Sequence, residues 1–139
     1  MIYNLEELKF ISNNTGNTFL VFVYCNLKKD FIFQDFLNKS EVEYLGEHTT
    51  KDKFIMYNMG KYPIVSDLDE GDGYVSGELY RVDNYTLVDL DKQNYLLRRK
   101  EIELSIGLKC YMYFISSRFN TKRISVNIEN NLIWKGKSC

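Results

Sequence analysis

The chain has 139 residues, of which 45% are apolar and 27% charged. This length and balance suit one compact domain, and they exclude two ordinary domains and a disordered chain. A net charge of −1 gives no electrostatic reason to bind nucleic acid or an anionic membrane, so neither is an expected partner. Aromatic residues make up 15% of the chain and favour pleated β structure.

Residues 1–17 are polar apart from a few apolar positions whose spacing predicts a short amphipathic helix packed on the domain, namely Leu5, Leu8, Phe10 and Ile11. We expect this segment to be an N-terminal extension and residues 18–139 to form the domain. The apolar run 18–24 predicts a fully buried strand. A polar loop is expected over residues 25–30, and a helical turn or short helix over 31–39.

From residue 42 onward, short alternating segments predict strands separated by polar turns. The first two are expected at residues 42–46 and 54–57. A brief extended piece follows at 62–65, where Pro63 favours a sheet edge or a bend. Turn-forming residues then predict a loop over 67–73.

Residues 74–82 alternate as another strand, in which Gly77 marks a bulge or a close approach of two backbones. Asn84 is the predicted N-cap of a helix that continues to Gln93. Four further strands are expected, at 102–104, 108–115, 124–126 and 132–134. The chain has no repeats and no linker, so the predicted fold class is α+β, a small mixed β-barrel with short helices.

The composition also bears on origin and location. The chain contains no alanine and a single proline, which is typical of an AT-rich genome such as that of a phage, a mobile element or an AT-rich microbe. Acids stand at its start where a signal peptide would carry basic residues, and no apolar run reaches the roughly 20 residues of a membrane span. The expected location is the cytoplasm.

The thiols and the single histidine are the residues from which a reactive site or a metal site would be built. Cys25, Cys110 and Cys139 are widely spaced and form no CxxC pair, which in a cytosolic chain indicates free thiols. His48 is the sole histidine, so a conventional His/Cys zinc site cannot be assembled, and no metal or cofactor is expected. A Cys25–His48 dyad is one interpretation; a strand histidine and a small buried thiol is the other. Three short basic clusters are interpreted as solvated faces, at 28–29, 98–100 and 122–123.

Several short motifs occur in a fixed order. Residues 21–29 read V-F-V-Y-C-N-L-K-K, and residues 73–83 read G-Y-V-S-G-E-L-Y-R-V-D. The shorter ones are G-K-Y-P-I-V at 60–65, Leu87 through Asp91, Tyr111-Met112-Tyr113 and Ile133-Trp134. Together, over about residues 19–135, they resemble the gamma-glutamylcyclotransferase-like superfamily, in its YtfP-like and gamma-glutamylamine cyclotransferase branch.

The resemblance implies a reaction in which the α-amine of a γ-glutamyl group attacks its own γ-carbonyl, releasing 5-oxoproline and a free amine. It also implies that the loop after the first strand holds the substrate with backbone N–H groups, and that one glutamate moves the protons. The implied ligand is a small molecule of γ-glutamyl or amino-acid character. The implied ligand-binding residues are Tyr24, Cys25, Asn26, Leu27 and Asn94.

Two departures from the family pattern weaken the case for catalysis. Cys25 replaces the loop glycine, and a side chain there obstructs a close backbone approach to a ligand, although Asn26 can still hydrogen-bond. The family motif L-D-x-x-E reads here as residues 90–94, L-D-K-Q-N, which puts Asn94 at the position of the catalytic glutamate. Asparagine cannot accept and return a proton, so no catalytic residue is assigned.

Other acids could replace the lost glutamate. Asp91 and Glu78 belong to the family pattern and are interpreted as structural, while Asp69 and Glu70 lie in the predicted loop. Three functions therefore stay open. The first is a non-catalytic member of the fold that binds a small ligand or a protein, the second is an active cyclotransferase with a relocated base, and the third is an interaction factor of a phage or mobile element.

Overall fold

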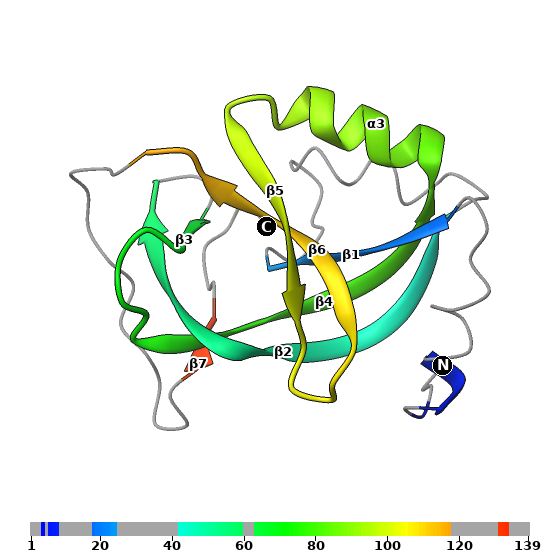
Figure 1. The fold of residues 1–139 in the computed structure, drawn as a ribbon, viewed down its shortest axis with the longest axis horizontal. Coiled ribbons are helices and arrows are strands. Elements are labelled where there is room, and N and C mark those ends of the chain that lie inside the picture. Colours follow the sequence, from blue (N-terminus) through cyan, green and yellow to red (C-terminus); the bar gives the residue numbers. More distant parts are fainter. Residues whose placement is uncertain are drawn as a thin grey trace.

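The computed structural model describes residues 4, 6–8, 18–24, 42–59, 63–117 and 131–133 (Figure 1). The predicted loop at 25–30, helix at 31–39 and strand at 124–126 lie outside these residues. The described elements are β1 (Thr18–Val23), β2 (Glu43–Asn58), β3 (Pro63–Ser66), β4 (Gly73–Asp83), α3 (Asn84–Gln93), β5 (Leu97–Glu103), β6 (Lys109–Ile115) and β7 (Asn131–Leu132). None of the helices within these residues is long and apolar enough to cross a membrane.

The described strands form one curled, mixed sheet in the order β3-β2-β4-β1-β6-β5, with β7 added beside β4. β1 pairs with β6 in parallel, and β7 pairs with β4 in parallel, while the other pairs are antiparallel. A single bridge between Thr50 and Leu104 joins β2 to the end of β5, so the described strands curl toward a barrel without a full ladder closing it. The predicted α+β class and mixed sheet are confirmed.

Alternating side chains of β1 divide the core into two layers. Leu20 and Phe22 point into the curl of the sheet and pack with residues such as Phe114 from β6. Val21 and Val23 point to the other face, where they pack with Leu87 and Leu90 of α3 and with Tyr113. Both faces of β1 are therefore covered, as the continuous apolar run predicts.

β2 is one long strand, whereas the sequence predicted two strands with a polar turn between them. It runs through the predicted turn and pairs with β4 along most of its length. Two register shifts interrupt the pairing, between Tyr44 and Glu47 and between Thr49 and Lys53. Bulges of this kind bend a strand without ending it, so the polar residues mark curvature and not a turn.

The helix α3 confirms the predicted span to Gln93, but its N-cap is Asp83 and not Asn84. Asp83 has extended backbone angles, and its side chain accepts a hydrogen bond from the Thr86 N–H at 2.7 Å. Asn84 is the first helical residue. Asp and Asn are about equally good N-caps, so residue type alone does not decide whether Asp83 or Asn84 caps the helix.

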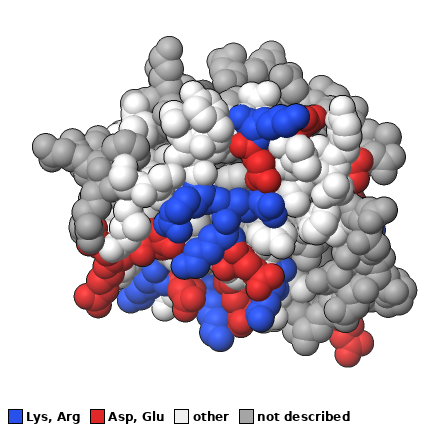
Figure 2. All heavy atoms as spheres, turned by 45° about the horizontal axis from the view of Figure 1, so that its top comes forward, with Lys and Arg blue, Asp and Glu red and all other residues white. Residues whose placement is uncertain are grey.

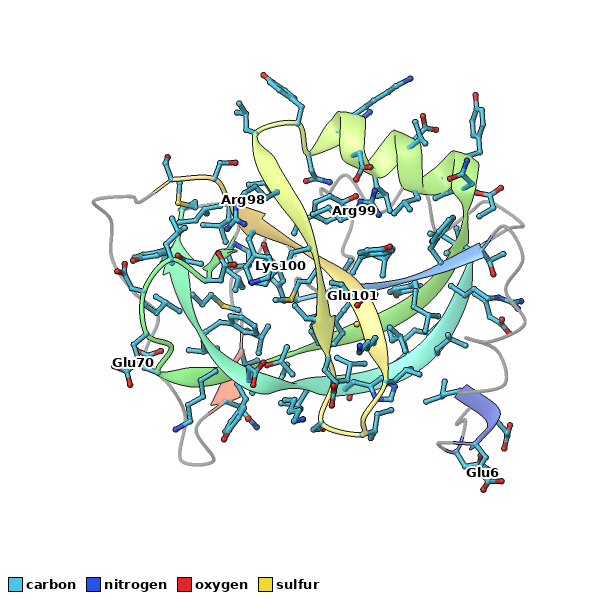
Figure 3. The ribbon with its side chains drawn as sticks, in the orientation of Figure 1. Glu6, Glu70, Arg98, Arg99, Lys100 and Glu101 are labelled. Carbon is cyan, nitrogen blue, oxygen red and sulfur yellow. The ribbon has the colours of Figure 1, made fainter. Side chains whose placement is uncertain are left out.

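β5 starts at Leu97, five residues before the predicted strand at 102–104, and carries the basic cluster 98–100. Figure 3 shows Arg98 and Lys100 on one side of β5 and Arg99 and Glu101 on the other, as strand alternation requires. Arg98 contacts Asp67 in the loop before β4, and Lys100 reaches the same carboxylate at 3.0 Å. In Figure 2 the basic side chains of this face are interleaved with acidic ones. The cluster is thus neutralised by its neighbours, which agrees with a solvated face.

The loop acid Asp67 is the centre of this contact. Burial alone would raise its pKa, but hydrogen bonds from Lys100 and Arg98, together with their positive charges, outweigh burial and lower the pKa of the Asp67 carboxyl. Its ionised form is therefore the one that holds the loop to β5.

The N-terminal segment contributes to the core. Residues 6–8 are helical, and the Asn4 side chain accepts from the Glu7 N–H at 2.8 Å. Leu8 is only 1% exposed and belongs to the cluster inside the curl of the sheet. This agrees with the predicted amphipathic helix packed on the domain.

Candidate functional site

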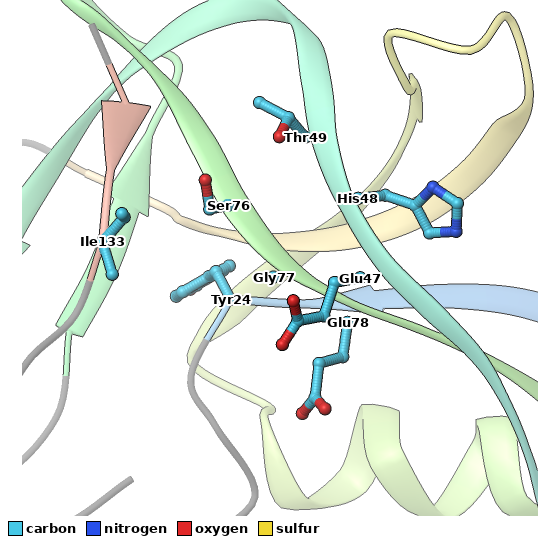
Figure 4. A pocket seen from close by; sticks show the side chains of 8 residues that line it. All are labelled: Tyr24, Glu47, His48, Thr49, Ser76, Gly77, Glu78 and Ile133. Atoms are coloured by element: carbon cyan, nitrogen blue, oxygen red, sulfur yellow. The ribbon is translucent and has the colours of Figure 1, made fainter. Parts of the chain in front are cut away.

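A pocket of about 320 Å³ lies where β1 ends, and Tyr24 forms part of its wall. Figure 4 shows its lining: Tyr24, Glu47, His48, Thr49, Ser76, Gly77, Glu78 and Ile133. A volume near 300 Å³ is at the lower end of the range for small-molecule pockets. Of the five predicted ligand-binding residues, the pocket includes Tyr24.

The pocket exists because two strands share one edge of β4. β1 pairs with the C-terminal half of β4 as far as Glu78, and β7 pairs with Tyr74 and Val75 near the start of β4. Ser76 and Gly77 lie between these two partners. The sheet therefore leaves a gap in its surface at this point, beside the chain that leaves β1.

Gly77 makes the predicted close backbone approach. A Cβ atom placed on it would lie 2.2 Å from the Val23 carbonyl oxygen and 2.9 Å from the Tyr24 Cα. No side chain fits there without moving the backbone that leads into the loop after β1. A glycine is thus required at this position to hold the end of β1 against β4.

Tyr24 is anchored to β6 beneath α3. Its hydroxyl donates to the Tyr113 carbonyl oxygen at 3.1 Å. The Tyr113 hydroxyl in turn donates to Asp91 Oδ1 at 2.7 Å, and Arg99 Nε lies 2.9 Å from the same oxygen. Burial and the hydrogen bond to Asp91 raise the pKa of Tyr113, so it stays protonated. Asp91 therefore has a structural role, as the sequence predicted.

Two carboxylates line the pocket from neighbouring strands. Glu47 of β2 and Glu78 of β4 are direct partners across the sheet, and Figure 4 shows both side chains on the same side of it. The Tyr80 hydroxyl donates to Glu78 Oε1 at 3.4 Å, and the Tyr44 ring lies 5.5 Å from the Tyr80 ring. Burial, followed by the negative charges of Glu78 and Glu47, raises the pKa of Tyr44. The negative charges of both carboxylates thus act on the Tyr44 hydroxyl.

His48 lines the pocket from the opposite direction. Its Nε2 is 3.0 Å from the Leu45 carbonyl oxygen, which can only accept, so Nε2 carries the hydrogen of that bond. Figure 4 shows the imidazole extending away from the two carboxylates. Its proposed dyad partner Cys25 lies outside the described residues. Within the described ranges, no three His, Cys, Asp or Glu side chains form a group that could hold a metal ion.

Asn94 lies at the C-terminal end of α3, and it is not among the residues that line this pocket. Its backbone N–H donates to the Leu90 carbonyl oxygen at 3.0 Å, and its side-chain Nδ2 donates to the same oxygen at 2.9 Å. The amide therefore caps the helix. An ionised glutamate has no hydrogen to donate there.

The sequence therefore predicts one residue at the end of the pocket, and it does not predict most of the other residues that line it. Cys25, Asn26 and Leu27 lie outside the described residues. The sequence predicts a polar turn between 46 and 54, which contains Glu47 and Thr49, and it offers His48 either as a strand histidine or as a partner of Cys25. Glu78 was assigned a structural role, and Ser76 and Ile133 had no role. The register of β2 on β4 brings these residues together, and no local pattern in the sequence reports it.

The sequence and the fold of this chain can be compared with those of known proteins. The family model described as "Gamma-glutamyl cyclotransferase, AIG2-like" matches residues 21–132. The chain belongs to this family. A Vibrio cholerae protein whose name proposes a gamma-glutamylcyclotransferase is 40% identical over 106 residues, which are 73% of this chain and 88% of that protein.

Solved structures of the family share the fold. The Escherichia coli protein ytfP is 28% identical, with a TM-score of 0.57 over 76% of this chain and 90% of that one. An uncharacterised protein of Pyrococcus horikoshii has a TM-score of 0.61 at 23% identity, over 76% of this chain and 85% of that one. A mouse AIG2-like protein has the same TM-score at 19% identity, over 75% and 81%. The predicted superfamily is confirmed.

Proposed function

We propose that this chain is a non-catalytic member of the gamma-glutamyl cyclotransferase family that binds a small molecule in the pocket beside Tyr24. The observation that carries the proposal is the side chain of Asn94. It stands where the family motif has its catalytic glutamate, and its amide donates to Leu90 at the end of α3. A neutral amide in this position neither takes a proton from an ammonium group nor returns one to a leaving amine.

The expected cost of this replacement is large. Cyclisation of a γ-glutamyl group requires the α-ammonium to lose a proton before it attacks the γ-carbonyl. Loss of a general acid and base lowers a rate by about 10²- to 10⁴-fold. The pocket nevertheless keeps its polar lining and room for a small ligand, which supports binding without turnover.

The ligand is of γ-glutamyl or amino-acid character, as the family membership suggests, and the protein acts in the cytoplasm. A protein partner and an origin in a phage or mobile element stay predictions. They rest on the sequence and not on the geometry of this pocket.

The test combines turnover and binding in one preparation. The purified chain is incubated with γ-glutamyl dipeptides and γ-glutamyl amines, and 5-oxoproline is measured by mass spectrometry. The expected result is release at the uncatalysed rate, together with saturable binding of at least one of these compounds in calorimetry. Turnover that disappears in Asn26→Ala would overturn the non-catalytic part of the proposal, and absence of binding would overturn the other part.

A second candidate is an active cyclotransferase in which Glu78 is the base. It is favoured by one observation: Glu78 lies in the pocket wall directly after Gly77, where β4 touches the end of β1. On this account, wild-type turnover falls at least about 10²-fold in Glu78→Gln and is kept in Asn94→Ala. Glu101→Gln is the matched control, because it removes the same charge from an exposed position on β5.

A further inference from the structure

We propose that Asp67 is an acid-sensitive latch on the seam of the sheet, and that protonation of its carboxylate lets β3 and the following loop swing away from β5 while the rest of the domain stays folded. The seam is the line along which the two edges of the curled sheet come together, with β3 and β2 on one side and β5 and β6 on the other. The inference goes beyond the proposed function, because it concerns the opening of the fold and needs no ligand in the pocket.

The two ends of the seam are closed in different ways. At the Thr50 end, the Thr50–Leu104 bridge joins β2 to the end of β5, and the Ser105 N–H donates to the Thr49 carbonyl oxygen at 2.9 Å. At the other end β3 pairs with β2 and β5 pairs with β6, and within the described residues no strand pairing joins β3 to β5 or to β6. Backbone hydrogen bonds therefore hold the first end, and side chains hold the second.

One carboxylate spans this second end, the Asp67 end. Asp67 directly follows β3, and its side chain is only 11% exposed. Lys100 Nζ lies 3.0 Å from Asp67 Oδ2, and Arg98 Nη2 donates to Asp67 Oδ1. Arg98 Nε also donates to the Ile115 carbonyl oxygen at 3.4 Å, so one guanidinium links the loop to β5 and β6. Removal of the Asp67 charge breaks both ion pairs at once.

The turn after β3 holds Asp67 in place beside a small apolar cluster. Ser66 Oγ accepts from the Leu68 N–H at 3.1 Å, so the two neighbours of Asp67 are tied to each other. Leu68 and Leu97 pack against a buried cluster that is separate from the large one inside the curl of the sheet. Its members are Ile55, Tyr57, Ile64 and Ile115. An opening at the Asp67 end thus loses few apolar contacts, which is typical of a local opening.

Acid is the trigger because the carboxyl is the member of the latch that changes charge. Among the described residues, the charged groups that act on Asp67 are Arg98 and Lys100, both on β5. Both stay protonated at acidic and neutral pH. Figure 3 shows them on the same side of β5, where they lose their shared anion when Asp67 is protonated. Asp67→Asn therefore imitates the protonated latch at every pH.

The experiment follows the exposure of two buried thiols in the full chain. Val65→Cys places a thiol of similar size at a fully buried position of β3, and the native Cys110 is kept near the Thr50 end, where it pairs with Ile102. Cys25→Ser and Cys139→Ser remove the other thiols. Labelling by a dipyridyl disulfide is resolved by mass spectrometry of the peptides, and each rate is divided by that of free glutathione at the same pH.

The thiol at position 65 should react at least about tenfold faster than Cys110 at pH 7. Its rate should also depend less on urea, because a local opening exposes less surface than global unfolding does. Asp67→Asn should speed labelling at position 65 by about fivefold. As the pH falls below about 4, the rate at position 65 should rise more in the chain that keeps Asp67 than in Asp67→Asn.

Glu103→Gln is the matched control. It breaks the 3.1 Å ion pair between Lys51 and Glu103, which joins β2 to β5 at the Thr50 end. Labelling at position 65 should stay within about twofold of the parent protein, because an opening at the Asp67 end leaves that pair intact.

Equal rates and equal urea dependence at positions 65 and 110 would overturn the inference, since the seam would then open only by global unfolding. An unchanged rate at position 65 in Asp67→Asn would also overturn it, as would an equal acceleration in Glu103→Gln. If Val65→Cys does not fold, peroxide oxidation of the native Met112 decides. Met112 is fully buried and pairs with Lys100, and it should oxidise faster in Asp67→Asn but not in Glu103→Gln. Equal oxidation in the two variants would contradict the latch.

Discussion

At the scale of single residues, Asn94 links structure and chemistry through one amide group. Its backbone N–H and its Nδ2 both donate to the Leu90 carbonyl oxygen at the end of α3. An asparagine side chain can donate the second of these hydrogen bonds, whereas an ionised glutamate cannot.

Gly77 sets the contact between β4 and the end of β1. We predict that Gly77→Ala destabilises the protein by about 3 kcal/mol, because the new methyl group would overlap the Val23 carbonyl oxygen. Urea unfolding measures the change. The control is Gly107→Ala, where nothing lies within 4 Å and a φ of 89° alone should cost about 1 kcal/mol. Equal losses in the two variants would show that the close approach at Gly77 is not present in solution.

At the scale of elements, α3 is fixed at one end by a carboxylate and at the other by an amide. We predict that Asp83→Ala lowers the free energy of unfolding by about 1 kcal/mol, because it leaves the Thr86 N–H without its acceptor. Asn84→Ala, one residue later, should change it by less than about 0.5 kcal/mol. Chemical unfolding of both variants checks this assignment. A larger loss in Asn84→Ala would restore the N-cap that the sequence first indicated.

The loop before β4 is held to β5 by a charge that acid removes. The pKa of Asp67 is lowered in the folded chain, so its stabilising contribution is present above about pH 4, the pKa of an unfolded aspartate, and is lost as pH falls through the folded pKa. We predict that Asp67→Asn is about 1 kcal/mol less stable than the wild type at pH 7. The difference should shrink as the pH falls below about 4 and through the lowered pKa of the folded chain. Unfolding curves at pH 7 and at a series of acidic pH values provide the measurement, and a difference that does not shrink in acid would contradict the charge-based account.

The elements that the sequence predicted well are those with a local pattern. β1, β4, β6 and α3 show continuous or periodic apolar residues, and the structure gives nearly the predicted bounds. The sequence predicts β2 and β5 too short, because their polar and charged stretches resemble turns. In the structure these stretches pair with neighbours that are distant in sequence. The site was only partly predictable for the same reason. Glu47 meets Glu78 through a register and a bulge that depend on tertiary packing.

At the scale of the whole molecule, Leu8 is part of the core although it precedes the region that the family model matches. We predict that Leu8→Ala costs about 2–5 kcal/mol, because Leu8 is buried inside the curl of the sheet. Glu7→Ala, exposed on the same turn, should cost less than about 0.5 kcal/mol. Thermal or chemical unfolding compares them. Similar stability of the two variants would mean that the segment can detach without loss.

The central claim concerns the whole protein: a cyclotransferase fold that binds without turning over. The most direct measurement is 5-oxoproline release from γ-glutamyl dipeptides and amines by the wild-type chain, followed over long incubation at high protein concentration. The account predicts a rate equal to that of the buffer alone, because Asn94 supplies no proton transfer. Release above that rate, abolished by Asn26→Ala or Glu78→Gln and kept in Glu101→Gln, would contradict it.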